Sequence, residues 1–253
     1  MDIDTNLLKD LEGYVIYSLD YKETSRIIKI FTKRLGVISV MARGAKNPKS
    51  KKMNLTSPYC KSKFNLKKSR DFYYLIDGEI IDANLGLRTS IDNLYYSQLF
   101  SEIILKTVYE NMENNEIYDF YDKILKHIDK IERKDILLAM FLLKYSSMLG
   151  YKPNLLSCIN CGKDRFNRVY FNIDYGGIVC QDCYGPVGGI ALSRQDYTYL
   201  TQLLYEKIDR ADEIDFPKAR ADEINRILMR FLFDKTEIKK LNSWDLIEKL
   251  KLL

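Results

Sequence analysis

The chain has 253 residues, of which 46% are hydrophobic and 30% are charged. It is long enough for two modest domains or one large core with an appended subdomain, which excludes a miniprotein. The composition is typical of globular rather than disordered proteins, and no apolar run approaches the ~20 residues that cross a bilayer. We therefore expect a soluble protein with no membrane contact.

The amino-terminal sequence MDIDTNLLKD is acidic and lacks the basic and then apolar pattern of a secretory signal. This predicts a cytoplasmic protein. Cysteine pairs in such a reducing compartment bind metal more often than they form disulfides.

Five segments in about the first 80 residues have the β-branched and aromatic content of strands: EGYVIYSLD, TSRIIKIFT, GVISVMA, residues 59–67 and DFYYLIDGEIID. In the fourth, Cys60, Ser62, Phe64 and Leu66 alternate with polar side chains, which predicts a half-buried strand with a lysine-bearing outer face. Five short strands predict an OB-type barrel over residues 1–82, and such barrels commonly bind oligonucleotides.

Positive charge is concentrated in this predicted barrel. Residues 22–70 hold 15 Lys and Arg against one acid, Glu23, a net charge of +14, whereas the whole chain carries +5. This asymmetry predicts a module that binds a polyanion, joined to a more acidic domain. The alternative is a basic surface that is merely solvated.

The stretch RGAKNPKSKKMN, between the third and fourth strands, contains the breakers Gly44 and Pro48 and has no apolar period. We expect an exposed, mobile loop whose cations contact phosphates without reading sequence. Candidate rings for base stacking are Tyr17, Tyr21, Tyr59, Phe72, Tyr73 and Tyr74, several of which must be core. The predicted DNA-binding residues are Arg26, Lys29, Lys33, Arg34, Arg43, Lys46, Lys49, Lys51, Lys52, Lys61 and Lys63.

From about residue 90 the apolar period becomes helical. Residues 117–131 form one apolar stripe, and eight consecutive apolar residues from Ile136 to Leu143 predict a central buried helix. Three more helices are predicted within residues 194–207, 217–233 and 243–253, with Pro217 in a first turn and Ser243 at an N-cap. The fold class is therefore α+β, with a helical domain over residues 83–253.

Two CxxC pairs interrupt this helical domain: Cys158 with Cys161, and Cys180 with Cys183, separated by 18 residues. Two thiolates from each turn complete a closed tetrahedral site, which predicts one structural Zn²⁺ in a ribbon-like module at about residues 155–190. A hairpin turning at Gly176 and Gly177 is expected between the pairs. Redox exchange and an iron-sulfur cluster are the alternatives. Cys60 is predicted to be a core residue.

Catalytic constellations are not evident in the sequence. His127 is the single histidine, at the edge of a helical stripe, and no G-x-S-x-G, GxxxxGK[ST] or GxGxxG accompanies it. A zinc hydrolase would need an open metal position, which four thiolates deny. We therefore predict that the protein is not an enzyme, with paired acids distant in sequence as the open alternative.

Two long strings in the chain carry a family resemblance. YKETSRIIKIFTKRLGVISVMARGAKNPKSKK resembles the amino-terminal signature of the bacterial RecO family of DNA repair proteins, and FLLKYSSMLGYKPNLLSCINCG followed by GGIVCQDC resembles its central helix and zinc module. The resemblance implies an OB barrel, a helical domain and a zinc-ribbon-like insert. It also implies that residues 43–52 are the basic loop and that the four paired cysteines are metal ligands.

Several functions and partners are implied by this resemblance. The protein would bind single- and double-stranded DNA and anneal complementary strands. It would also work with RecR to load the RecA recombinase onto DNA coated by single-stranded DNA-binding protein. The carboxy-terminal tail of that coating protein would contact the helical domain. A cytoplasmic, nucleoid-associated protein is expected. The alternative is a zinc-containing translation or transcription factor that uses the same barrel on RNA.

Overall fold

The computed structural model describes residues 6–69 and 72–250. Its contacts divide the chain into two compact units, residues 1–129 and 130–253. Within the described residues, no helix combines the length and the apolar character that a membrane crossing requires.

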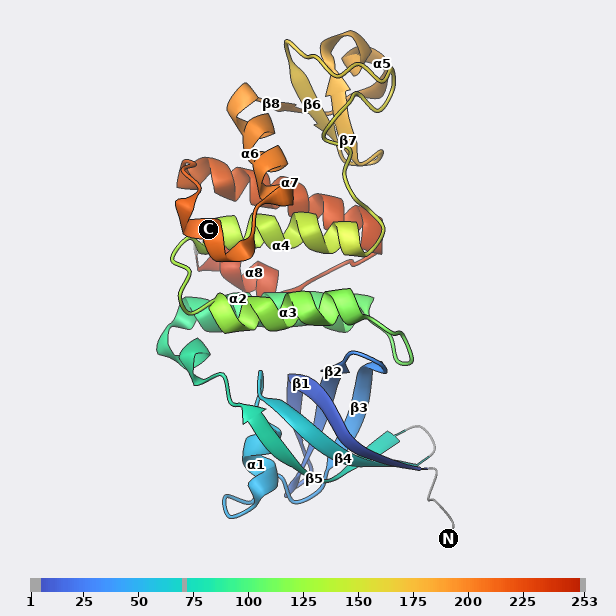
Figure 1. Cartoon of the computed structure of the whole chain (residues 1–253), viewed down its shortest axis with the longest axis vertical. Coiled ribbons are helices and arrows are strands. Elements are labelled where there is room, and N and C mark those ends of the chain that lie inside the picture. Colours follow the sequence, from blue (N-terminus) through green and yellow to red (C-terminus); the bar gives the residue numbers. More distant parts are fainter. Residues whose placement is uncertain (1–5, 70–71, 251–253) are drawn as a thin grey trace. The chain divides into compact units, whose positions relative to one another are not determined.

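The first unit contains a closed five-stranded barrel, built from β1 (Leu7–Tyr21), β2 (Ser25–Thr32), β3 (Gly36–Ala42), β4 (Lys61–Ser69) and β5 (Phe72–Asp82) (Figure 1). The strand order is β1-β2-β3-β5-β4, in which β3 and β5 pair in parallel and the other neighbours are antiparallel. All five strands lie where the sequence predicts them. The OB-type barrel is therefore confirmed.

Side chains on β4 alternate between the two faces of the barrel wall. Ser62, Phe64 and Leu66 are buried, whereas Lys63 and Lys67 are exposed. Cys60, just before the strand, is 1% exposed, as predicted for a core residue. The alternation of apolar and polar residues along this strand therefore predicted correctly which side chains face the barrel interior and which face solvent.

The prediction of a loop over residues 43–54 is wrong for the last four residues, 51–54. Residues Lys51–Leu55 form a short helix, α1, which begins at Ser50, whose side chain accepts a hydrogen bond from the Lys52 backbone N–H. Leu55 is buried against the barrel, with Leu55 Cδ2 near Gly78 on β5. The five-residue helix is too short to show the apolar period that identifies longer helices, so the sequence pattern did not reveal it.

Two longer helices complete the first unit, α2 (Ile91–Thr107) and α3 (Asn115–His127), after a 3-10 turn at Leu85–Thr89. The Tyr121 ring of α3 lies edge-on to Tyr14 of β1, with ring centroids 5.3 Å apart. Ser101 of α2 hydrogen bonds to Tyr121 at 2.6 Å. Two helices therefore share a compact unit with the barrel, and the division between residues 1–82 and 83–253 stays a prediction about domains.

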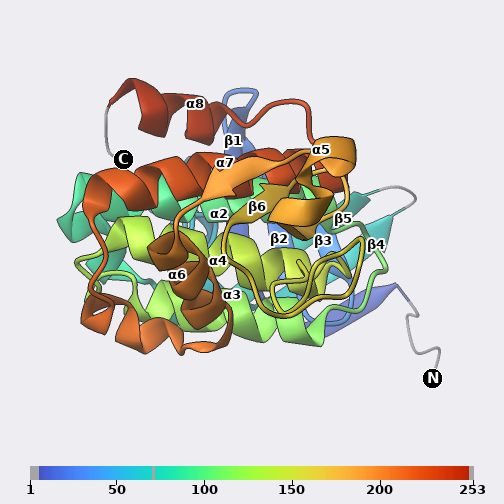
Figure 2. The same ribbon diagram turned by 90° about the horizontal axis from the view of Figure 1, so that it is seen from above.

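In the second unit, α4 (Lys134–Met148) is the central helix, and every residue from Ile136 to Leu143 is at most 1% exposed. The other helices are α6 (Arg194–Tyr205), α7 (Lys218–Thr236) and α8 (Asn242–Lys249), with a 3-10 segment at Ile208–Glu213. Helix α7 runs alongside α4, as Figures 1 and 2 show. The predicted buried helix is confirmed.

Two helix starts differ from the sequence prediction. Pro217 lies at the N-cap of α7 in an extended conformation instead of in the first turn, and Leu241 occupies the N-cap of α8. Ser243 is therefore inside α8. Leu241 is fully buried, and the predicted and observed starts differ by two residues, the usual scatter of helix boundaries.

The cysteine region forms a three-stranded sheet of order β7-β6-β8, from β6 (Val169–Asn172), β7 (Gly177–Cys180) and β8 (Ile190–Leu192). Gly176 adopts a positive φ of 67° in the turn between β6 and β7, which confirms the predicted hairpin. A 3-10 turn at Gln181–Cys183, the short helix α5 (Tyr184–Val187) and strand β8 were not predicted.

Candidate nucleic-acid surface and metal centre

Some of the predicted DNA-binding cations hold the first unit together. The Arg26 guanidinium donates to the Met53 carbonyl and the Thr56 hydroxyl beside α1, and pairs with Asp20 at 3.1 Å. The Lys61 side chain is only 12% exposed, and its ammonium lies between two carboxylates. These two side chains are already committed to contacts within the protein.

Four other predicted DNA-binding cations form an ion pair or a hydrogen bond within the first unit. Lys33 pairs with Asp119 at 2.6 Å, and Lys46 pairs with Asp20 at 3.3 Å. The Lys29 ammonium donates to the Ser39 hydroxyl at 2.6 Å on the neighbouring strand, and Lys52 donates to a backbone carbonyl of β5 at 3.0 Å. A phosphate at any of these positions would have to share the ammonium.

The remaining predicted cations are exposed: Arg34, Arg43, Lys49, Lys51 and Lys63. Among the described residues, none of these five has an ion-pair partner. The Arg43 guanidinium lies over the Tyr74 ring, 4.9 Å from its centroid, an arrangement that leaves its N–H donors available. This set can contact phosphates without breaking a contact within the barrel.

The candidate stacking rings differ in how far each is exposed to solvent. Tyr73 is 3% exposed inside the barrel, and burial raises the pKa of Tyr59 to about 12. Tyr17, Tyr21 and Phe72 are between 38% and 41% exposed. These rings, together with the half-buried Tyr59 and Tyr74, have exposed surface that could contact a base. Leu19, on the same strand as Tyr17, is also exposed, although aliphatic residues in a predicted strand are expected to be core.

The Lys61 contact alters the acidity of its partners. Burial alone would lower the pKa of Lys61, but its hydrogen bonds to Asp122 and Glu12 outweigh that effect and raise it. Burial would likewise raise the pKa of Asp122, but hydrogen bonds from Lys126, Lys61 and Tyr14 lower it to about 2. The charges at this position are therefore neutralised within the protein.

The four paired cysteines meet in one cluster, with their sulfur atoms all within 4.8 Å of one another. Cys161 Sγ and Cys180 Sγ are 3.7 Å apart, and Zn–S bonds of about 2.3 Å in a tetrahedron give sulfur–sulfur edges of about 3.8 Å. The Cys180 backbone N–H donates to Cys158 Sγ at 3.4 Å, and the Asn160 amide donates to Cys183 Sγ at 3.3 Å. The four thiols can therefore hold one metal ion.

The pKa values of two cysteines in the cluster reflect the close approach of the four thiols. Burial tends to raise the pKa of Cys158, but backbone N–H groups of Cys180, Cys161 and Asn160 lower it to about 6. The Asn160 amide favours the thiolate of Cys183, yet the Cys161 thiol and burial together raise the pKa of Cys183 to about 12. Four thiolates this close repel one another, and a divalent cation removes that repulsion.

Comparison with known proteins covers most of the chain. The family profile described as "Recombination protein O C terminal" matches residues 88–245, and the profile described as "Recombination protein O N terminal" matches residues 8–84. The chain belongs to the RecO family. Membership places it among proteins of DNA repair and recombination, and confirms the resemblance seen in the sequence strings.

Curated RecO relatives match over nearly their full length. The DNA repair protein RecO of Acetivibrio thermocellus is 28% identical over 247 residues, which cover 97% of this chain and 98% of that protein. The DNA repair protein RecO of Clostridium acetobutylicum is 33% identical over 218 residues, 85% of this chain and 88% of that protein. The N-terminal and C-terminal profiles of the family match consecutive parts of this chain.

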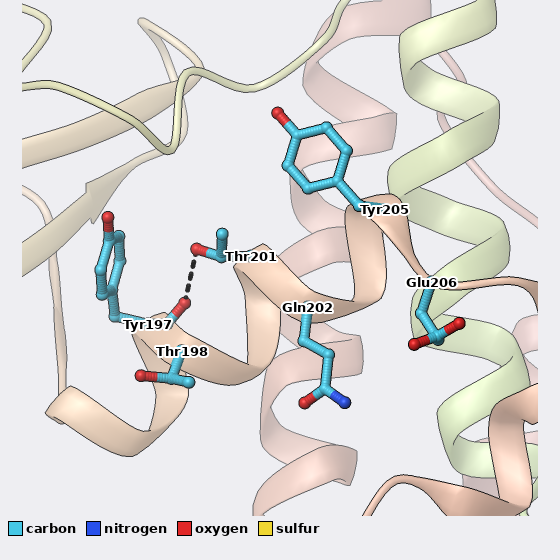
Figure 3. A pocket seen from close by; sticks show the side chains of 6 residues that line it. All are labelled: Tyr197, Thr198, Thr201, Gln202, Tyr205 and Glu206. Atoms are coloured by element: carbon cyan, nitrogen blue, oxygen red, sulfur yellow. Dashed lines mark hydrogen bonds between the residues drawn. The ribbon is translucent and has the colours of Figure 1, made fainter.

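Two further features of this RecO-family chain are its histidine, His127, and a pocket along α6. His127 is half-buried on α3, with its Nδ1 2.7 Å from the Lys123 carbonyl of the preceding turn. An open pocket of about 600 Å³ runs along α6 (Figure 3). Its lining residues are Tyr197, Thr198, Thr201, Gln202, Tyr205 and Glu206. This pocket contains one acid and no histidine or cysteine, and none of the predicted site residues lines it.

Proposed function

We propose that the protein is a recombination mediator that binds single- and double-stranded DNA through the basic surface of its barrel. In this role it anneals complementary strands and helps to load a recombinase onto DNA coated by single-stranded DNA-binding protein. Membership of the RecO family and the five exposed, unpaired cations Arg34, Arg43, Lys49, Lys51 and Lys63 support the proposal. We call these five residues the free cation set.

The free cation set narrows the eleven residues that the sequence suggested. A lysine that is already paired gains less from a phosphate, because it must give up a carboxylate to bind one. Lys61, held by two acids, is therefore left out of the proposed surface, and Arg26 is left out because it supports α1. Lys29, Lys33, Lys46 and Lys52 remain secondary candidates.

Annealing follows from the same physical chemistry. Two strands repel each other through their phosphates, and a broad cationic surface reduces this repulsion without selecting a sequence. The surface must also bind weakly enough for the strands to search for their register. Lys49 and Lys51 lie on either side of the Ser50 cap of α1, so Lys51 is the first residue of this short helix and Lys49 lies just before its cap.

The binding test neutralises part of the free cation set. In Lys49→Gln/Lys51→Gln/Lys63→Gln, we expect weaker DNA binding and a shallower salt dependence. The slope of log K against log salt should fall by up to about 0.9 for each lost contact to duplex and about 0.7 for each lost contact to single strands. A salt titration followed by fluorescence anisotropy measures both quantities.

A matched control tests whether DNA binding depends on the barrel surface or on the total charge of the protein. Lys207→Gln/Lys218→Gln/Lys239→Gln removes the same charge from exposed positions in the second unit. We expect this control to keep most of the binding and the wild-type salt slope. Equal losses in the two variants would contradict the proposal that the barrel surface is the binding site.

We also propose that the four paired cysteines hold one structural Zn²⁺. All four positions of a tetrahedral ion would be filled by Cys158, Cys161, Cys180 and Cys183, so the ion would stabilise the small sheet and take no part in binding substrate. Three of the four cysteines are buried, in agreement with a closed site.

The partners follow from the family resemblance. We propose that the protein acts with RecR, that it contacts the carboxy-terminal tail of single-stranded DNA-binding protein through its helical domain, and that RecA is reached indirectly. No covalent chemistry is required for these steps, and a nucleoid-associated location is expected. Annealing of oligonucleotides, with and without bound single-stranded DNA-binding protein, tests this set. Failure to anneal either substrate would contradict the mediator function.

A further inference from the structure

One cysteine of the cluster in the second unit differs from the other three in its access to solvent. Cys158 and Cys180 are 2% exposed, and Cys183 is 8% exposed. Cys161, by contrast, is exposed. Each of the four would be a thiolate in the proposed metal site, and the thiolate is the form of cysteine that reacts with oxidants. An oxidant in solution can therefore reach one thiolate of the cluster directly.

Backbone hydrogen bonds hold the turn that carries Cys161. The Gly162 N–H donates to the Cys158 carbonyl at 2.8 Å, and the Cys158 N–H donates to the Lys163 carbonyl at 2.8 Å. Gly162 has a positive φ of 74°, and its chain neighbours apart, no heavy atom of the described residues lies within 4 Å of the place where a Cβ would be. The turn is therefore ordered by its own backbone and open to solvent at Gly162.

A second sulfur atom lies close to that of Cys161. The Cys161 Sγ and Cys180 Sγ atoms are 3.7 Å apart, so small shifts of the two side chains bring them to bonding distance. Cys180 is the last residue of β7, and its backbone N–H donates to Cys158 Sγ at 3.4 Å. Cys180 is thus covered from solvent but adjacent to the exposed thiol. An exposed reacting cysteine with a resolving cysteine beside it is the arrangement of many oxidant-sensing sites.

The cysteines are also a large part of the core of their own module. The buried cluster there consists of Cys158, Cys180, Cys183 and Val179, against which partly buried apolar side chains pack. Small metal-binding modules take much of their folding free energy from the bound ion, because they can bury little apolar surface. Joining two of the thiolates would therefore loosen the sheet of β6, β7 and β8.

We propose that Cys161 is a modification site at which hydrogen peroxide oxidises the cysteine cluster, and that Cys180 completes the reaction as the disulfide partner. The inference rests on the proposed Zn²⁺ site and adds a redox response to it. Once these two sulfur atoms are joined, only Cys158 and Cys183 remain as ligands, too few for a closed tetrahedral site. The cluster then loses its ion and the module loosens. The other cysteine of the chain, Cys60, is 1% exposed in the barrel and stays reduced.

One molecule of hydrogen peroxide is consumed for each disulfide. The Cys161 thiolate attacks one peroxide oxygen, which forms an S–O bond and breaks the O–O bond, and the hydroxide that leaves takes a proton to become water. The Cys180 thiolate then attacks the sulfur of the resulting sulfenic acid. This forms the S–S bond and expels a second hydroxide, which also becomes water. The two sulfur atoms together lose two electrons, and the peroxide gains them.

The first experiment treats the full-length, zinc-loaded protein with hydrogen peroxide. A chromogenic chelator measures the released zinc, and mass spectrometry of alkylated peptides identifies the disulfide. We expect one zinc ion to be released for each Cys161–Cys180 disulfide, with Cys60 still free, and zinc to bind again after reduction with dithiothreitol. A first disulfide that does not include Cys161 would overturn the inference.

Two variants that keep four metal ligands test the role of the exposed thiol. Cys161→His replaces it with an imidazole, which zinc accepts in sites of three cysteines and one histidine. We expect this variant to release zinc at least about tenfold more slowly under peroxide, because its remaining thiolates are buried. Cys183→His is the matched control, since it makes the same exchange at a buried position and keeps Cys161 and Cys180. It should release zinc at the wild-type rate, and equal slowing in both variants would contradict the role of Cys161.

A chemical label tests the same order of reaction without any variant. Dimedone reacts with sulfenic acids, and in the zinc-loaded wild-type protein we expect its first adduct on Cys161. Mass spectrometry of peptides locates the adduct. An adduct that forms first on one of the three buried cysteines of the cluster would refute the inference.

The outcomes separate this inference from the proposed metal site. If the reduced protein binds zinc and peroxide neither releases it nor oxidises Cys161, the metal site stands and the redox inference is wrong. If the reduced protein binds no zinc, both proposals fail. Zinc binding measured before any oxidant is added therefore tests the metal site by itself.

Discussion

The Lys61 ammonium lies 2.7 Å from an Asp122 carboxylate oxygen, and this contact joins strand β4 of the barrel to helix α3. The same carboxylate accepts from the Tyr14 hydroxyl of β1 at 2.7 Å and pairs with Lys126 at 2.7 Å. Lys61 also pairs with Glu12 at 3.0 Å. One acid on α3 therefore ties the helix to two strands that lie side by side in the barrel.

Replacing Asp122 should destabilise the first unit. Asp122→Asn keeps the shape of the side chain but removes the charge that neutralises Lys61, whose side chain is 12% exposed. Because one partner of a largely buried pair would be left without the other, we expect a loss of about 2 to 4 kcal/mol. Urea unfolding measures it. Asp119→Asn, which breaks the exposed pair with Lys33, should cost less than about 1 kcal/mol. Equal losses in both variants would contradict the role assigned to Asp122.

Asp122 should also contribute to the pH dependence of stability. Its pKa in the folded protein is about 2, below the ordinary value of 3.8. The stabilisation is therefore fully present above about pH 4, and it is lost as the pH falls through about 2, because the unfolded chain binds the proton more tightly. The difference in urea midpoint between the wild type and Asp122→Asn should shrink between about pH 4 and about pH 2. A difference that stays constant over this range would be inconsistent with the lowered pKa.

Lys61 and Lys63 provide a comparison on a single strand. Both were predicted to bind DNA, yet Lys61 is held by Glu12 and Asp122 whereas Lys63 is exposed. Lys61→Ala should lower the unfolding midpoint and leave the salt slope of DNA binding nearly unchanged. Lys63→Ala should have the reverse effect. Anisotropy titrations and urea unfolding on the same two proteins test this, and a reduced salt slope for Lys61→Ala would reverse the assignment.

The cysteine cluster makes a prediction about metal content. Cys158→Ser should lower the bound zinc, measured by elemental analysis, and the melting temperature of the second unit together, because a missing thiolate opens the tetrahedron. Cys60→Ser is the matched control. Cys60 is buried in the barrel and lies 3.3 Å from the Ser62 hydroxyl, so its replacement should affect stability without changing zinc content. Full zinc content in Cys158→Ser would contradict the four-thiolate site.

The barrel and the cysteine hairpin could be predicted because their signals are local. Alternation along β4 separated Phe64 and Leu66 from Lys63, and the short spacing within each CxxC pair brings its two sulfur atoms to one point. The short helix α1 and the start of α8 at Leu241 were not predicted. A five-residue helix has no period to detect, and local capping signals locate helix ends only to within one or two residues.

The sequence alone determined the fold class, the family and the places where charge and thiols concentrate, since these depend on composition, period and spacing. It assigned the same role to all eleven predicted DNA-binding residues of the barrel, because a lysine in a sequence carries its charge whatever surrounds it. Only the tertiary structure separated Lys61, neutralised by an acid 61 residues away, from the free Lys63. It alone also aligned Leu19, Ile27, Met41 and Tyr74 in one row, because strand register depends on pairing between segments far apart in the chain.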